Sequence, residues 1–95
     1  MSKEFSIMPP SPIYSTTRYD GLHRHEVFYG ANRQKSIKDG LVVFLPPAMH
    51  NMSDIGVHFN QAFDIYLKQM GQKAWMDYYG KTVEDFICEY GKNYL

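Results

Sequence analysis

Two segments decide the fold of this chain: LHRHEVF at residues 22–28 and GLVVFL at residues 40–45. The first segment alternates enough in polarity to form a strand, which we expect to reach Tyr29. The second is a continuous run of mainly β-branched and aromatic residues, and it must stop at Pro46 because proline cannot donate to a strand ladder. The sequence therefore predicts two strands.

The segments that flank the first strand favour irregular structure. Residues 30–40 are polar, basic and rich in turn-forming residue types, so we expect an ordered connecting loop with one helical turn around residues 35–38. Residues 1–19 carry three prolines among serines and threonines, a composition that resists both helix and ladder pairing. We predict a loosely packed, extended N-terminal arm over residues 1–19, followed by a folded domain over residues 20–95.

Helical spacing dominates the second half of the chain. Apolar residues recur every three or four positions from Phe59 to Tyr79, and Gly80 supplies a natural stop. Thr82 is a suitable N-cap for a second helix, with acidic residues following it and Gly91 ending it. The sequence therefore predicts an α+β domain in which two strands precede a long helix and a short C-terminal helix.

Composition limits the kind of protein this is. At 95 residues the chain supports one small domain, and its 44% hydrophobic content is that of a globular protein. Its single cysteine, Cys88, excludes an internal disulfide and a multi-cysteine zinc site, so a transition metal needs imidazole, carboxylate or amide ligands. No stretch approaches the ~20 apolar residues that span a membrane, and no secretory signal is recognisable. We expect a cytoplasmic protein that does not bind membranes.

Four histidines bracket the predicted strands: His23, His25, His50 and His58. His23 and His25 lie two residues apart, so both project from one face of a regular strand, whereas Glu26 points to the opposite face unless a bulge turns it. His50 and His58 flank a turn rich in Asn, Ser, Asp and Gly, which allows the chain to fold back and bring both imidazoles together. Imidazoles with one carboxylate suit one divalent ion (Zn, Ni, Mn or Mg), and such sites cleave phosphodiesters.

These segments resemble the small HNH-type proteins encoded in bacteriophages and prophages, over residues 21–95. The resemblance implies a ββα-metal (His-Me finger) core, in which two strands and a helix hold one divalent ion. In that family a histidine at the end of the first strand activates water, and the ion holds the scissile phosphate. The residues that carry the resemblance are HEVF at 25–28, GANRQKS at 30–36, GLVV at 40–43, HN at 50–51, GVHFN at 56–60 and GKNYL at 91–95.

The resemblance also implies roles for the histidines. His50 and His58 match the two metal ligands that the family supplies after the second strand. The first strand admits two alignments, and both stay open here. In one, His25 is a ligand and Glu26 takes the position of the general base, although a carboxylate with an ordinary pKa of ~4.3 is a weaker base than a histidine near ~6.5. In the other, His25 is the base and His23 helps to bind the ion.

The connecting loop carries the remaining candidate residues. The family's middle asparagine, which orients the base from the start of the second strand, has no counterpart at Gly40, and Asn32 is the best substitute. Formal net charge is zero, which argues against a dedicated nonspecific DNA-binding protein, yet residues 18–38 hold five basic residues against two acidic ones. A basic loop beside a metal is where a nucleic-acid backbone must pass, so Arg33 and Lys35 are candidate phosphate contacts, and Arg24 of the first strand is a third.

The leading hypothesis from the sequence is therefore a divalent-metal-dependent DNA endonuclease of the phage HNH type, and hence an enzyme. The alternative is a degenerate HNH module that binds nucleic acid or a phage or host protein without cleavage, which the missing asparagine, the glutamate in the base position and the zero net charge favour. A third hypothesis is a purely structural zinc domain, which metal chelation would unfold.

Overall fold

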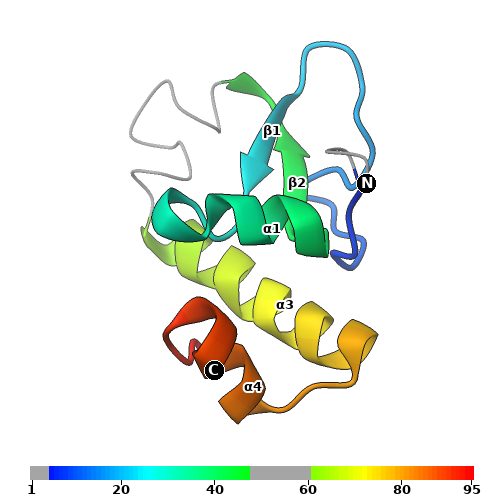
Figure 1. The fold of residues 1–95 in the computed structure, drawn as a ribbon. Helices are drawn as coiled ribbons and strands as arrows, with labels where there is room; N and C mark the ends of the chain where they lie inside the picture. The colour runs from blue at the N-terminus through cyan, green and yellow to red at the C-terminus, as the bar shows by residue number, and fades with distance from the viewer. Residues whose placement is uncertain (1–4, 48–60) are drawn as a thin grey trace.

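The computed structural model describes residues 5–47 and 61–95 and has an α+β fold (Figure 1). This confirms the prediction that two strands precede a long helix and a short C-terminal helix. Among the described helices, none combines the length and apolar character that a membrane crossing needs. The elements in chain order are β1 (His23–Glu26), the 3-10 turn η1 (Gly30–Asn32), α1 (Arg33–Asp39), β2 (Val42–Leu45), α3 (Gln61–Tyr79) and α4 (Val83–Tyr90).

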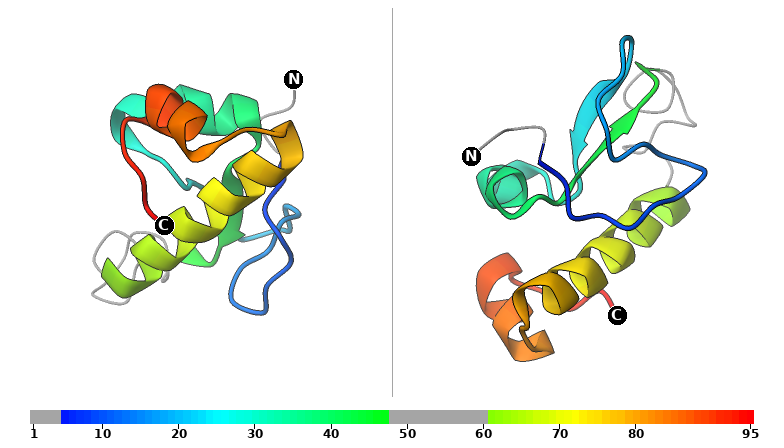
Figure 2. Two further views of the ribbon diagram at one scale, coloured as in Figure 1. Left: turned by 90° about the horizontal axis from the view of Figure 1, so that it is seen from below. Right: turned by 90° about the vertical axis from the view of Figure 1, so that its right-hand side faces the viewer.

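Helix α3 lies below the β1–β2 sheet in Figure 1, and α1 contacts α4 directly through Lys35 and Glu89 (Figures 1 and 2). An aromatic cluster fills the space between these elements, in which Phe28 packs edge-on against Phe86 with ring centroids 5.4 Å apart. Gly71 allows α3 to approach closely, because a Cβ there would come within 3.1 Å of Val27 and Phe28. The buried members of this core are Met8, Tyr14, Val27, Phe28, Leu41, Val43, Leu45, Leu67, Trp75, Phe86 and Tyr90.

The sheet has two antiparallel strands in a register that pairs His23 with Leu45 and Glu26 with Val42. All four residues of β2 are buried, as its unbroken apolar sequence predicts. The first strand is shorter than expected, because it ends at Glu26 instead of continuing to Tyr29. Two of the three predicted catalytic residues, His25 and Glu26, therefore lie at the end of β1, and the third, Asn32, lies in η1.

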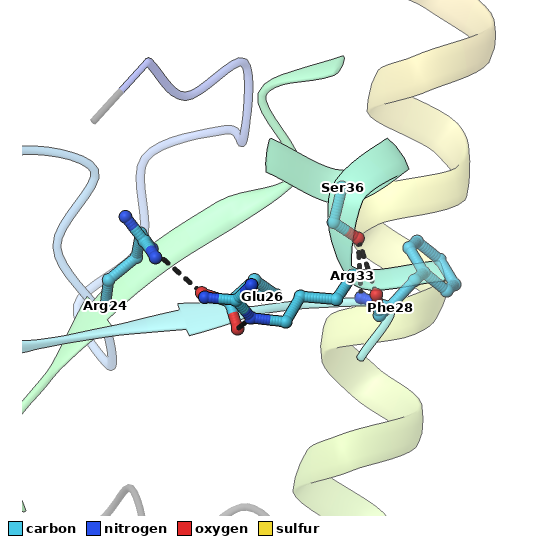
Figure 3. A network of polar contacts seen from close by, with 5 residues as sticks. All are labelled: Arg24, Glu26, Phe28, Arg33 and Ser36. Carbon is cyan, nitrogen blue, oxygen red and sulfur yellow. Dashed lines mark hydrogen bonds and ion pairs between the residues drawn. The ribbon is translucent and has the colours of Figure 1, made fainter. Parts of the chain in front are cut away.

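The segment between the strands is more helical than the sequence predicts. The expectation of a loop with one helical turn is wrong, because η1 is followed by the two-turn helix α1. Ser36 fastens this helix to the residues that follow β1. Its buried hydroxyl accepts from the Phe28 amide at 3.0 Å and donates to the Phe28 carbonyl at 2.8 Å, which holds α1 against the strand end (Figure 3). Gly40 ends α1 at φ +80°, where a Cβ would also lie 2.7 Å from the Phe5 ring.

The N-terminal arm is packed against the sheet, so the expectation of loose packing is wrong. Met8 and Tyr14 are only 5% and 7% exposed. Ser15 exchanges two backbone hydrogen bonds with Phe44, of 3.1 and 2.8 Å, on the edge of β2 that does not face β1. The arm turns back on itself between Ser11 and Tyr14, which form an antiparallel bridge, and it covers backbone groups that an exposed edge strand would leave unpaired.

Helix α4 begins and ends as predicted. The Thr82 hydroxyl accepts from the Asp85 amide at 3.2 Å, and the Asp85 carboxylate accepts from the Thr82 amide at 3.0 Å, which together form a capping box. Hydrogen bonding to Thr82 holds the pKa of the Asp85 carboxyl below its usual range. Gly91 ends the helix in the left-handed conformation.

Candidate functional site

Strand β1 presents its two histidines and its two charged residues on opposite faces, because side chains alternate along a strand. His25 is 1% exposed, whereas His23, at the start of the strand, is exposed. The His25 ring lies against Tyr29, with ring centroids 5.7 Å apart. The pair of imidazoles therefore runs from the surface at His23 to the interior at His25.

Beside His25 lies a polar cluster that the sequence analysis missed, formed by Tyr29, Asp64 and Lys68. The Tyr29 hydroxyl donates to Asp64 Oδ1 at 3.0 Å, and Lys68 Nζ donates to Asp64 Oδ2 at 2.9 Å. Lys68 Nζ also lies 3.3 Å from the Tyr29 hydroxyl and 4.4 Å from the centre of the Tyr29 ring. The only signal in the sequence was the i,i+4 spacing of Asp64 and Lys68, and nothing in the sequence joined Tyr29 to them.

The environment of this cluster fixes its protonation at neutral pH. Burial raises the pKa of Tyr29, with Asp64 adding to the rise and Lys68 opposing it. Burial alone would lower the pKa of Lys68, but its hydrogen bond and charge attraction to Asp64 raise it overall. A neutral hydroxyl and a charged ammonium group are therefore both bonded to one carboxylate, in a cluster that the Tyr29 ring joins to His25.

The opposite face of β1 holds Glu26 between two arginines (Figure 3). Arg24 Nε donates to Glu26 Oε2 at 2.8 Å, and Arg33 Nε donates to Glu26 Oε1 at 3.2 Å. Both carboxylate oxygens are thus paired with guanidinium groups, and the side chain of Glu26 is 14% exposed. Arg24 and Arg33, two of the predicted phosphate-binding residues, are therefore bound to Glu26, the residue that one alignment predicts as the base.

Asn32 and Lys35, the other candidates from the connecting segment, contact α4. The Asn32 side chain donates to the Tyr90 carbonyl at 3.2 Å, which satisfies a backbone group at the end of that helix. Lys35 Nζ donates to the Glu89 carbonyl and lies 3.7 Å from the Glu89 carboxylate. Both side chains therefore fasten α1 to the C-terminal helix, and their predicted roles in catalysis and DNA binding stay predictions.

Comparison with known proteins finds no match among family models, curated proteins or solved structures. The resemblance to HNH-type proteins therefore stays a prediction, and the function has to be argued from the residues and contacts above.

His50 and His58, the two predicted ligands of the second half of the site, lie outside the described residues. Within residues 5–47 and 61–95, no group of three or more histidines, cysteines or carboxylates is close enough to hold a metal ion. The described part of the candidate site consists of His23 and His25 with the Tyr29 cluster beside them. The predicted ion would need at least one ligand from residues 48–60.

Proposed function

We propose that this protein is a divalent-metal-dependent endonuclease of the HNH type that cleaves phosphodiester bonds in DNA. The observation that carries the proposal is the position of the histidine pair. His23 and His25 share one face of β1, and His23 is paired with Leu45 at the end of β2. From that end the chain runs directly into residues 48–60, which supply His50 and His58.

Chain connectivity supports a shared site for the four histidines. His50 follows Leu45 by five residues, and an extended chain spans at most ~3.3–3.6 Å per residue, so His50 stays within ~18 Å of the His23 end of the sheet. His58 precedes Asp64 by six residues. Asp64 accepts a hydrogen bond from Tyr29, and the Tyr29 ring lies against His25. The first turn of α3 is therefore close to the histidine pair.

The donor set fits a divalent ion. Imidazole nitrogens are ligands for Zn, Ni and Mn, and the described chain offers two of them on one strand face. A bound ion would supply charge stabilisation for the leaving oxygen and a more acidic water. In the alignment with His25 as the base, His23, His50 and His58 are the residues that would hold it; in the other alignment His25 joins them.

The contacts of Glu26 favour a histidine as the proton acceptor in this reaction. A general base needs a free lone pair within hydrogen-bond reach of the water that it deprotonates. Two arginines hold Glu26 on the face of β1 opposite the histidine pair, so it points away from the proposed ion, whereas an imidazole accepts protons near neutral pH. Of the two alignments, the structure therefore supports His25 as the base with His23 among the ligands.

The Arg24–Glu26–Arg33 network serves in this proposal as the contact surface for DNA. Two guanidinium groups share one carboxylate, which leaves a net positive charge and the terminal nitrogens of both arginines for phosphate oxygens. Arg33 is the more accessible of the two, with its side chain 46% exposed. Lys35 is a weaker candidate for a phosphate contact because it is already bound to Glu89.

The test is nicking of supercoiled plasmid by the purified protein with Mg, Mn or Ni ions. We expect the wild-type protein to nick, His25→Ala and His58→Ala to be inactive, and the exposed-site control Glu84→Ala to retain activity. Because all four proteins are purified in the same way, the inactive variants also control for contaminating nucleases. Absence of nicking with every one of these ions would refute the proposal.

One observation favours a second candidate function, a module that binds DNA without cutting it. Glu26 is engaged by two arginines and Asn32 by Tyr90, so neither is free to act at a metal without breaking those contacts. The discriminating measurement is fluorescence anisotropy with labelled duplex DNA. Binding that persists in His50→Ala, together with no nicking by the wild-type protein, selects the binding module. Nicking by the wild-type protein excludes it.

A further inference from the structure

Helix α3 has a buried face and, beside it, a partly exposed apolar stripe in which Met70 still packs against the core. The first face buries Leu67, Gly71 and Trp75. The second is a stripe of residues four positions apart, in which Tyr66 is 38% and Tyr78 is 61% exposed. Residues at this spacing lie above one another on a helix surface, so the stripe is continuous along α3. Its members are Tyr66, Met70, Ala74 and Tyr78.

The N-terminal arm turns this face into a groove of about 470 Å³. Its walls are anchored, because the Ile7 amide donates to the Gly40 carbonyl at 2.8 Å and the Tyr14 hydroxyl donates to the Pro9 carbonyl. At one end the Phe5 ring meets the Tyr78 ring with centroids 6.2 Å apart. The groove is therefore preformed, and its lining is Ile7, Pro9, Met70, Lys73, Ala74, Asp77 and Tyr78.

Two residues of the groove lining, Lys73 and Asp77, are charged, and their charges indicate what kind of partner binds in the groove. They are one helical turn apart and of opposite sign, and both are exposed. If a second α3 packs against the first in the antiparallel sense, Lys73 faces Asp77 of the partner subunit and Asp77 faces Lys73 of the partner subunit. Ala74, which lies beside them in the groove lining, is small enough for two helices to approach closely. The lining is thus complementary in charge to a copy of itself.

We propose that this groove is a homodimer interface in which the α3 helices of two copies pack antiparallel. A twofold interface must be self-complementary, and this one satisfies that condition with two symmetric ion pairs. The chain carries no net charge, so two copies do not repel each other at long range. The groove itself has no net charge, which does not suit the phosphate backbone of DNA. The proposal is independent of the nuclease function.

The experiment is a charge swap across the interface. Lys73→Asp places two pairs of like charges in the dimer, Asp77→Lys does the same with the opposite sign, and the double variant restores both attractive pairs. Light scattering after size-exclusion chromatography, repeated over a range of concentrations, measures the dissociation constant of the dimer. We expect wild type and the double variant to reach twice the 11.1 kDa mass of one chain, and each single variant to dissociate at least about tenfold more readily.

Three outcomes would overturn the proposal. The first is a monomeric wild-type protein at every concentration. The second is dimerisation that neither single variant weakens, since the interface would then lie elsewhere on the molecule. The third is a double variant that stays as weak as the single ones, because antiparallel pairing requires the swap to restore it. Both side chains are exposed, and unchanged urea unfolding of the single variants, measured at a concentration where every variant is monomeric, confirms that any loss is one of association.

Discussion

Ser36→Ala is the substitution whose cost follows most directly from the structure. The Ser36 hydroxyl is fully buried and makes two hydrogen bonds to the backbone of Phe28, one to its amide and one to its carbonyl. Alanine would leave both backbone groups buried without that partner, at about 1–3 kcal/mol each. Alanine is also the better helix former by roughly 0.5 kcal/mol, which offsets a small part of the loss. We expect a net loss of about 2–5 kcal/mol in the free energy of unfolding.

The chain contains its own matched control. The Ser15 hydroxyl makes the same two bonds to the backbone of Thr17, accepting from its amide at 3.0 Å and donating to its carbonyl at 2.6 Å, but these bonds are exposed. Water replaces them in Ser15→Ala, so that loss should stay below about 1 kcal/mol.

Urea unfolding followed by circular dichroism measures both variants against wild type. The dependence of the unfolding free energy on urea concentration should not change. The urea concentration at the midpoint of unfolding should fall by roughly 1 M or more for Ser36→Ala alone. Equal losses in the two variants would show that the burial of this hydrogen-bond pair does not govern its contribution.

Two further predictions concern Asp39 and Tyr14. The Asp39 carboxylate accepts from Trp75 Nε1 at 3.0 Å and from the Tyr90 hydroxyl at 2.8 Å, so Asp39→Ala should cost about 2 kcal/mol or more and shift the emission of this single tryptophan. Asp39→Asn, which keeps an acceptor oxygen, should cost less, and equal losses would contradict this reasoning. Burial, followed by the neighbouring Tyr66, raises the pKa of Tyr14 to about 12. Because the folded pKa exceeds the unfolded value of ~10, the stabilisation from Tyr14 is complete below pH ~10 and declines as pH rises towards ~12. Tyr14→Phe should therefore lose less stability than wild type over that interval, and identical losses in the two proteins would contradict the assignment.

The elements that could be predicted from the sequence are those that local patterns specify. Helix α3 follows from its helical spacing and from the glycine after Tyr79, and α4 follows from the Thr82 cap and Gly91. Strand β2 follows from an apolar run closed by proline. In each case the residues that define the element lie within it or next to it.

Helix α1 and the arm could not be predicted because tertiary contacts decide them. Helix α1 has no apolar stripe, and its buried residues are only Ser36 and Ile37. It is held by the bonds from Ser36 to Phe28, eight residues earlier in the chain. The arm has a composition typical of a loose segment, but the free edge of β2 binds its backbone and the core buries Met8.

The same limit applies to the candidate site. The spacing of His23 and His25 predicted that they share a strand face, and the structure agrees in placing the charged residues of β1 together on the other. The contact of Tyr29 with Asp64 joins residues 35 positions apart, and the pairing of Glu26 with Arg33 depends on a helix that the sequence did not predict. Single-residue patterns specify which groups are present, and the fold decides which of them meet.

The central claim is that the histidines of this chain gather around one divalent ion. The most direct measurement is anomalous X-ray diffraction from a crystal soaked in Ni or Zn ions. The account predicts one strong peak with nitrogen atoms of at least three of His23, His25, His50 and His58 within ~2.0–2.3 Å. A crystal that shows no such peak, or that places the four imidazoles around separate surfaces, would contradict it.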